Sequence, residues 1–355
     1  MIARRLPGQI ARHISLLTMV WLLIGCSGTG AEGETAVPST TDEADHENEA
    51  EEEMLTLPEL TAADLNGEPL QVVASTSIIG NVVAQVGGAT IALTTLMGAG
   101  QDPHSYEPGA QTLTAVAQAD VIFINGWDLE ESLVHDLETI GEDVPVVAIS
   151  ANIEPLDAKE AEPDDEHEEA DEHEHSGADP HVWFDIQNVV QWAENVAQVL
   201  AELDPANTAA YQNNAAAYTA ELLALETDVK QQLAALPPEN RVLVTNHDSF
   251  SYFAQAYNFE VLGTVLPGSS TVAEPSASDL AALIGTMEEH GVCTIFTETT
   301  VSDSLSQTVA AELDACDAVQ VVPLYTGAIG PAGSGAESYI DMFRANVETI
   351  VAGLK

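Results

Sequence analysis

Residues 70–97 read LQVVASTSIIGNVVAQVGGATIALTTLM, and this stretch decides the fold class. The apolar run at 70–76 predicts a buried strand, and 78–86 predicts a helix that ends at Gly87 and Gly88. Residues 91–97 predict a second strand. A strand, a helix and a strand in this order are typical of a parallel sheet with helices on its faces.

The same alternation continues on both sides of a helical middle region. We predict further strands at 121–125, 144–149, 241–245, 260–265, 293–297 and 319–322. We predict further helices at 111–118, 129–140, 249–257, 276–290, 304–313 and 336–352. Between the two series lie Ala-rich helices at 186–203 and 205–236, the second stopped by Pro237 and Pro238. At 1.5 Å per residue the second helix is long enough to join two lobes. The fold class is therefore α/β, with two lobes, each a mainly parallel sheet flanked by helices.

The first 26 residues are typical of an export signal. Arg4, Arg5 and Arg12 form a basic start, and an apolar run too short to span a bilayer follows. The run ends in Leu-Ile-Gly before Cys26, which resembles a lipobox. We predict a signal peptide at 1–25, a lipid on the Cys26 thiol, and a flexible acidic tether at 26–68. An ordinary secretory signal with an incidental cysteine is the alternative.

These features predict an exported chain, anchored by lipid to the outer face of the cell membrane or held in the periplasm. The domains that follow the tether are a lobe at 69–185, a helical region at 186–238 and a lobe at 239–355. Export makes a disulfide between Cys293 and Cys316 chemically feasible, and two free buried thiols are the alternative.

The charge balance excludes some partners. The chain has 58 acids and 8 bases, which disfavours nucleic acid and anionic membranes because both need clustered Lys and Arg. It favours cations. Much of the acid lies in two runs, 42–53 and 157–179, which are expected to be solvated and disordered.

Histidines near predicted strand ends indicate a metal site. The tripeptide Asp-Pro-His occurs at 102–104 and again at 179–181, and His247 follows the first strand of the second lobe. Because ligands of such sheets bind at the carboxyl ends of strands, His104, His181 and His247 are expected to converge between the lobes. Three imidazoles suit Zn²⁺, whereas Mn²⁺ prefers more oxygen ligands.

The other histidines are weaker candidates for metal ligands. His13 leaves with the signal, His46 lies in the tether, and His135 and His290 are single polar positions on predicted helices. The acidic tract 164–175 adds an accessory group that would collect metal without fixed geometry: His167, His173 and His175.

Several ordered segments resemble the metal-binding lipoproteins of ABC importers for zinc and manganese. The matching segments are 102–108 (DPHSYEP), 179–185 (DPHVWFD), 246–254 (NHDSFSYFA), 274–280 (EPSASDL), 296–299 (FTET) and 325–339. The resemblance covers about residues 70 to 355. It implies two lobes bridged by one rigid helix, with metal in the cleft. Zinc importers of this family place His where this chain has His247, whereas manganese importers place Glu. An acidic, His-rich loop before the second segment is also a trait of the zinc group.

One position departs from the family pattern. Many members have an Asp ligand where this chain has Gly327, which has no side chain. Water, Glu298 or a carboxylate of the acidic loop would then complete the site. Asp102, Glu107 and Asp185 are candidates to orient the imidazoles, with turn and capping roles as the alternative.

We therefore expect a monomeric, non-enzymatic protein that captures Zn²⁺ and delivers it to the permease of an ABC transporter. The chain has neither a Gly-x-Ser-x-Gly elbow nor a His-Glu-x-x-His motif. The alternatives are a manganese-delivering member of the same family, a zinc hydrolase that uses three histidines, and a surface adhesin.

Overall fold

The computed structural model describes residues 54–140, 144–158 and 177–355. These residues all belong to one compact unit, 50–355. The predicted signal peptide, Cys26, most of the tether, and His167, His173 and His175 lie outside the described residues. No helix of the described chain is long and apolar enough to cross a membrane.

The N-terminal lobe is built on a four-stranded parallel sheet in the order β2-β1-β3-β4. Its strands are β1 (Leu70–Ala74), β2 (Ile91–Thr95), β3 (Val121–Ile124) and β4 (Val146–Ala148), and its helices are α1 (Ser77–Gly87), α2 (Ala110–Val116) and α3 (Glu131–Ile140). Thr76 begins α1 because its hydroxyl accepts the N–H of Ile79, at 3.2 Å. Gly88, with φ of 58°, lets the chain turn away at the end of α1.

The C-terminal lobe repeats this plan with the order β6-β5-β7-β8, again all parallel. Its strands are β5 (Val242–Thr245), β6 (Glu260–Thr264), β7 (Thr294–Glu298) and β8 (Gln320–Leu324), and its helices are α6 (Ser251–Tyr257), α7 (Ala277–His290), α8 (Ser304–Glu312) and α9 (Tyr339–Gly353). A capping box between Ser276 and Asp279 starts α7, and Gly291 in a left-handed conformation ends it. A disulfide joins Cys293 to Cys316 within this lobe.

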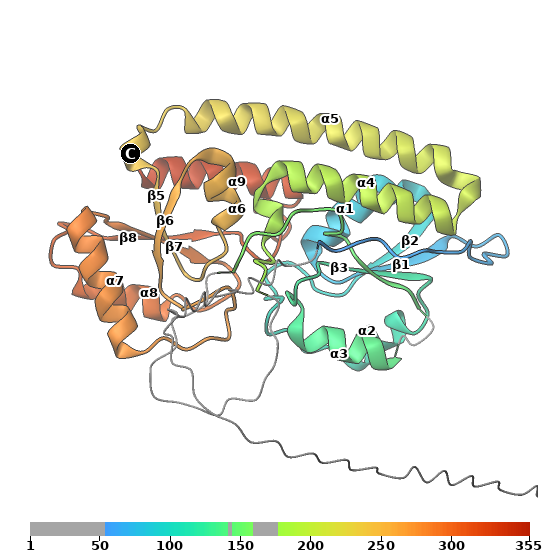
Figure 1. The fold of residues 1–355 in the computed structure, drawn as a ribbon, viewed down its shortest axis with the longest axis horizontal. Coiled ribbons are helices and arrows are strands. Elements are labelled where there is room, and N and C mark those ends of the chain that lie inside the picture. Colours follow the sequence, from blue (N-terminus) through green and yellow to red (C-terminus); the bar gives the residue numbers. More distant parts are fainter. Residues whose placement is uncertain (1–53, 141–143, 159–176) are drawn as a thin grey trace, which may run out of the picture. The chain divides into compact units, whose positions relative to one another are not determined.

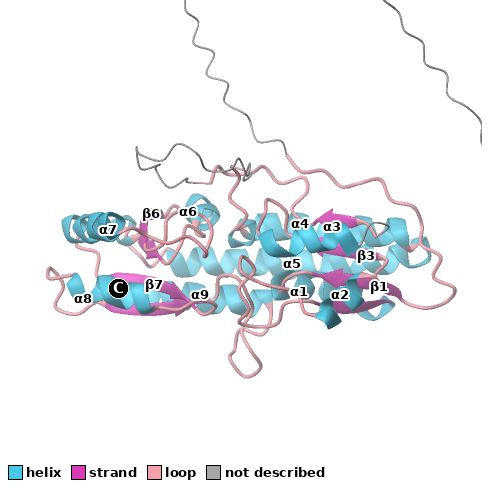
Figure 2. Cartoon of the chain, turned by 90° about the horizontal axis from the view of Figure 1, so that it is seen from below, coloured by secondary structure: helices cyan, strands magenta, loops and turns pink. Residues whose placement is uncertain are grey.

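Two helices connect the lobes. The helices α4 (Ile186–Leu203) and α5 (Thr208–Leu233) pack together, and α5 also contacts α1 of the N-terminal lobe and α9 of the C-terminal lobe. Figure 1 shows α5, in yellow, running above α4 and α9 from one lobe to the other, and Figure 2 shows the same helices from below. One hydrophobic cluster includes residues of both sheets and of these helices, so the lobes share a core.

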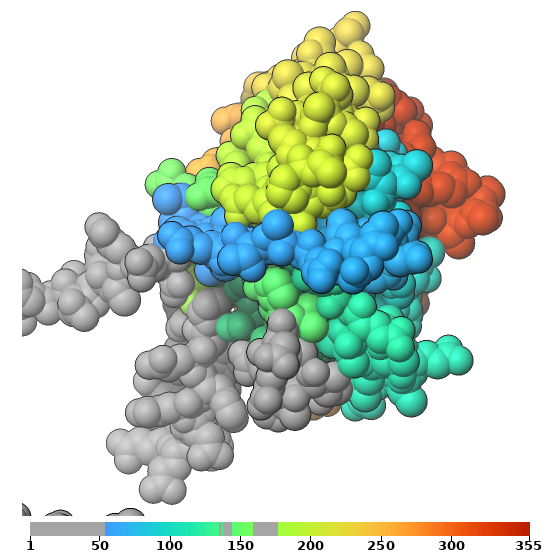
Figure 3. All heavy atoms as spheres, turned by 90° about the vertical axis from the view of Figure 1, so that its right-hand side faces the viewer, coloured from blue at the N-terminus to red at the C-terminus, as the bar shows by residue number. Residues whose placement is uncertain are grey.

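The described chain begins on the surface of the N-terminal lobe. Leu55, Leu57, Leu60 and Leu65 pack against the shared core, and the N–H of Ala63 donates to the carbonyl of Leu203, at 2.8 Å. In Figure 3 this first segment, in blue, lies directly beneath the yellow-green helices. The packed body therefore begins before residue 69, and the predicted tether is shorter than 26–68, because the partly buried leucines of 55–65 pack against the core.

The two-lobe α/β fold with a long joining helix is confirmed. The differences lie at element ends. The strand predicted at 121–125 ends at Ile124, and the helix predicted from 129 begins at Glu131, because a left-handed turn at Gly126, Trp127 and Asp128 intervenes. The long helix begins at Thr208 because 205–207 form a separate 3-10 turn.

Candidate metal centre

Three histidines from separate segments meet between the lobes. His104 lies in the loop after β2, His181 directly precedes the 3-10 turn Val182–Phe184, and His247 follows β5. All three are buried, with at most 3% of each residue exposed. The Nε2 of His181 lies 3.3 Å from Nε2 of His104 and 3.0 Å from Nε2 of His247. Among the described residues, they form a group whose ligand atoms all lie within 4.8 Å of one another.

Carboxylates contact two of the three rings on the side away from the cluster. Asp179 Oδ1 accepts a hydrogen bond from His181 Nδ1, at 2.8 Å. Glu298 Oε1 accepts one from His247 Nδ1, and Glu298 Oε2 accepts the hydroxyl of Thr326, at 2.5 Å. A carboxylate on Nδ1 fixes the ring orientation and leaves Nε2 free to bind a metal. Glu298 therefore lies where it would orient the His247 ring.

His104 is held through its backbone. Its N–H donates to Asp102 Oδ1, at 3.2 Å, whereas its Nδ1 has no hydrogen-bond partner among the described residues. Asp102 Oδ2 accepts the hydroxyls of Ser105 and, from the other lobe, Thr271, at 2.8 and 2.7 Å. Asp102 thus orders the His104 loop and ties it to the C-terminal lobe.

Burial and neighbouring charges set the protonation of the three rings. Burial lowers the pKa of His104 well below its ordinary value, and His181 and His247 lower it further. Burial also lowers the pKa of His181, with His247 acting in the same direction. Burial alone would lower the pKa of His247, but the Glu298 carboxylate outweighs it and raises that pKa. The rings of His104 and His181 are therefore neutral and can offer a lone pair to a cation.

The other predicted site residues lie elsewhere. Asp185 caps α4 by accepting the N–H of Gln187, at 2.9 Å, and Glu107 is exposed. The carboxylates in contact with the imidazoles are Asp179 and Glu298, in place of Asp185 and Glu107. His290 is exposed at the end of α7.

Sequence reasoning missed the role of Asp179, although the repeated tripeptide held the signal. In both copies the Asp side chain accepts the N–H of the His two residues later. Only in the second copy does the same carboxylate also reach the ring.

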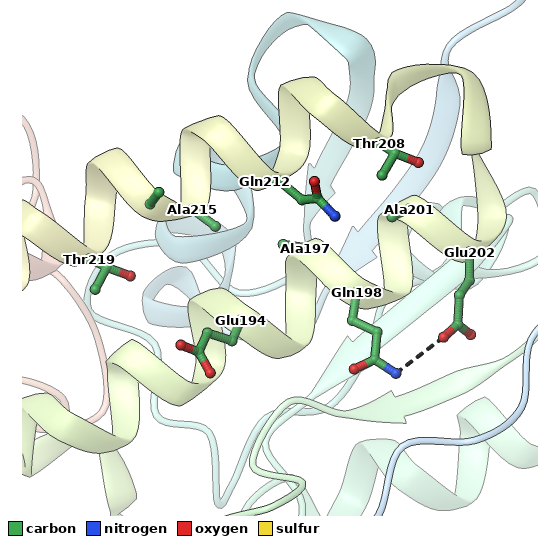
Figure 4. A pocket seen from close by; sticks show the side chains of 10 residues that line it. Glu194, Ala197, Gln198, Ala201, Glu202, Thr208, Gln212, Ala215 and Thr219 are labelled. Atoms are coloured by element: carbon green, nitrogen blue, oxygen red, sulfur yellow. Dashed lines mark hydrogen bonds between the residues drawn. The ribbon is translucent and has the colours of Figure 1, made fainter.

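A groove lies away from the histidines. It runs between α4 and α5, has a volume of about 730 Å³, and its floor includes Ala197 and Ala215 (Figure 4). Gln198 and Glu202 on its α4 side are joined by a hydrogen bond of 3.1 Å. None of the three histidines lines this groove, so it is separate from the candidate metal centre.

Two α/β lobes joined by a long helix, with buried imidazoles converging between them, define a metal-binding solute-binding protein of an ABC importer. The chain belongs to the ZnuA family, "zinc-uptake complex component A periplasmic", whose family model matches residues 72–353.

Named relatives differ in their metal. The chain is 35% identical over 294 residues to the manganese-binding lipoprotein MntA of Halalkalibacterium halodurans, covering 83% of this chain and 91% of that one. It is 34% identical over 300 residues to the zinc-binding protein TroA of Treponema pallidum, covering 82% of this chain and 91% of TroA.

The related solved structures also differ in the metal that they are named for. The periplasmic zinc-binding protein TroA of Treponema pallidum superimposes with a TM-score of 0.70 at 32% identity, covering 81% of this chain and 99% of TroA. A manganese-bound periplasmic metal-binding protein from Candidatus Liberibacter asiaticus gives 0.68 at 27% identity, covering 80% of this chain and 99% of that one. The chain therefore belongs to this family, and the metals named for its relatives do not identify the metal of this chain.

Proposed function

We propose that this protein captures Zn²⁺ outside the cytoplasm and delivers it to the membrane permease of an ABC importer. His104, His181 and His247 would bind the ion through Nε2. The observation that carries the proposal is the convergence of three buried Nε2 atoms, two of them on rings held from behind by carboxylates.

The donor set favours zinc over manganese. Imidazole nitrogen is a borderline donor that suits Zn²⁺, whereas Mn²⁺ prefers carboxylate and water oxygen. The two Glu298 oxygens accept hydrogen bonds from His247 Nδ1 and the Thr326 hydroxyl, and the converging group found among the described residues consists of the three histidines, which supports water over Glu298 as the fourth ligand. Water would fill the fourth position of a tetrahedral zinc ion.

Manganese delivery is the second candidate, and the 35% identity to a manganese-binding lipoprotein favours it. Metal analysis of protein purified without added metal, followed by a Zn²⁺/Mn²⁺ competition titration, separates the two. Preferential retention of manganese would overturn the zinc proposal. Zinc-loaded protein that turns over neither esters nor amides would exclude the hydrolase alternative.

The anchoring and assembly of the chain complete the proposal. A lipid on Cys26 would hold a monomer at the membrane surface, within reach of its permease. His167, His173 and His175 would collect cations near the tight site without forming part of it. Deleting 164–176 should then leave the stoichiometric Zn²⁺ affinity nearly intact. A large loss of affinity in calorimetry would instead assign the fourth ligand to that segment.

A further inference from the structure

A second buried polar cluster lies in the N-terminal lobe, and the metal site does not include it. The side chain of Glu130 is fully buried. Its Oε1 accepts the hydroxyl of Ser75, at 2.5 Å, and the backbone N–H of Asn125, at 2.9 Å. Its Oε2 is buried and has no hydrogen-bond partner among the described residues. Ser75 and Asn125 directly follow β1 and β3, so Glu130 links the carboxyl ends of two neighbouring strands.

An unusual turn brings Glu130 to this place. Gly126, Trp127 and Asp128 follow one another with φ of 97°, 48° and 55°. Two consecutive non-glycine residues in the left-handed region persist only where the surrounding structure fixes them, and such residues cluster at functional sites. Here the turn reverses the chain after β3 and places the Glu130 carboxyl against the residue that precedes the turn.

The cluster connects to the metal site through one amide. The side-chain Nδ2 of Asn125 donates to the carbonyl of Pro180, at 2.8 Å. Pro180 lies between Asp179, which holds the ring of His181, and His181 itself. Glu130 fixes the backbone of Asn125, and Asn125 fixes the peptide that carries His181.

We propose that Glu130 is a positioning residue for the metal site, acting through Asn125 and the Pro180 carbonyl on His181. The proposal rests on the proposed function, because it takes His181 as a ligand. Burial raises the pKa of Glu130 to about 7, and Asp128 acts in the same direction, against the hydrogen bonds from Ser75 and Asn125. Glutamine therefore resembles the neutral form of this carboxyl and should support the same contacts.

The test measures Zn²⁺ affinity by competition with a chromophoric chelator in a set of full-chain variants. Glu130→Ala and Asn125→Ala should each weaken binding about five- to tenfold, the loss expected for one hydrogen bond. The double variant should be no weaker than Asn125→Ala alone, because both changes break one path. Glu130→Gln should stay within about threefold of the parent protein.

Matched controls separate positioning from general stability. Val83→Ala removes buried apolar volume from α1 and should lower the unfolding temperature while leaving the Zn²⁺ affinity unchanged. Equal loss in Val83→Ala and Glu130→Ala would overturn the proposal, as would additive losses in the double variant. If Glu130→Ala does not fold, Ser75→Ala and Glu130→Gln carry the comparison: Ser75→Ala should weaken binding, and parent-like affinity would count against the proposal.

One further variant distinguishes failure of the proposal from failure of the proposed function. His181→Ala should abolish tight Zn²⁺ binding. If it does so and Glu130→Ala binds like the parent protein, only the positioning role is refuted. If His181→Ala binds Zn²⁺ normally, the ligand set itself is refuted.

Discussion

Replacing Gly327 by alanine is expected to weaken metal binding although the position is not a ligand. A Cβ atom at Gly327 would lie 2.7 Å from Cδ and 3.3 Å from Cγ of Pro103, which belongs to the other lobe and precedes His104. Carbon atoms pack at about 3.5–4.0 Å, so the two segments would have to separate by about 1 Å. Overpacking of this kind costs about 1–3 kcal/mol. If this strain destabilises the conformation in which the three imidazoles converge, the Kd for Zn²⁺ rises about 5- to 150-fold.

The assay is a competition titration of Gly327→Ala against the parent protein, with Gly285→Ala as the matched control. Gly285 lies in α7 of the same lobe, and a Cβ there would meet nothing within 4 Å. Gly285→Ala should bind Zn²⁺ normally, because only Gly327 faces the His104 loop. Gly327→Asp should also bind less tightly, since its carboxylate begins with the same Cβ. An affinity for Gly327→Ala within about twofold of the parent protein would refute the reasoning, because the clash would then be relieved without moving His104.

Three other outcomes are expected. His247→Glu should shift preference from Zn²⁺ towards Mn²⁺, because a hard carboxylate replaces a nitrogen; unchanged selectivity in competition titrations would contradict this. Thr271→Val should speed Zn²⁺ dissociation several-fold in a chelator chase, because it removes the hydroxyl that ties Asp102 to the C-terminal lobe, whereas Thr271→Ser should release metal at the parent rate. Because the pKa of Glu130 is raised from 4.5 to about 7, the folded protein keeps a proton that the unfolded chain loses. The contribution of Glu130 to the free energy of unfolding should therefore fall by about 3 kcal/mol as the pH rises from 4.5 to about 7, and it should stay constant above that pH. Urea titrations across this pH range should find this decrease in the parent protein and not in Glu130→Gln.

The fold followed from the sequence because strands and helices alternate with clear apolar runs and explicit stops. Gly87 and Gly88 mark the end of α1, so this bound was predicted closely. The turn at Gly126–Asp128 was not predicted. Trp127 and Asp128 adopt a conformation that local preference disfavours, and only tertiary contacts hold them there.

The three histidines could be predicted because each follows a strand or an inter-element loop on the same side of its sheet. Their carboxylate partners could not. Glu298 reaches His247 from a strand 51 residues further along the chain, so no local spacing relates them. Asp179 and Asp102 occupy the same place in the same tripeptide, and only the direction of the imidazole ring makes one of them a partner of Nδ1. Ring direction depends on the packing between lobes, which sequence spacing does not encode.

The absence of a side chain at Gly327 and the engagement of Glu298 are connected features of this site. Any side chain at Gly327 would begin against Pro103, so a carboxylate there would require the His104 loop or the segment after β8 to shift. Thr326, the residue before Gly327, donates instead to Glu298 and holds that carboxylate on His247. The segment after β8 thus supports the His247 imidazole indirectly, through Glu298. The described cluster thus offers three imidazole nitrogens, the donor set on which the proposal of zinc rests, and sequence similarity adds nothing to that choice because a manganese-binding relative is as similar as a zinc-binding one.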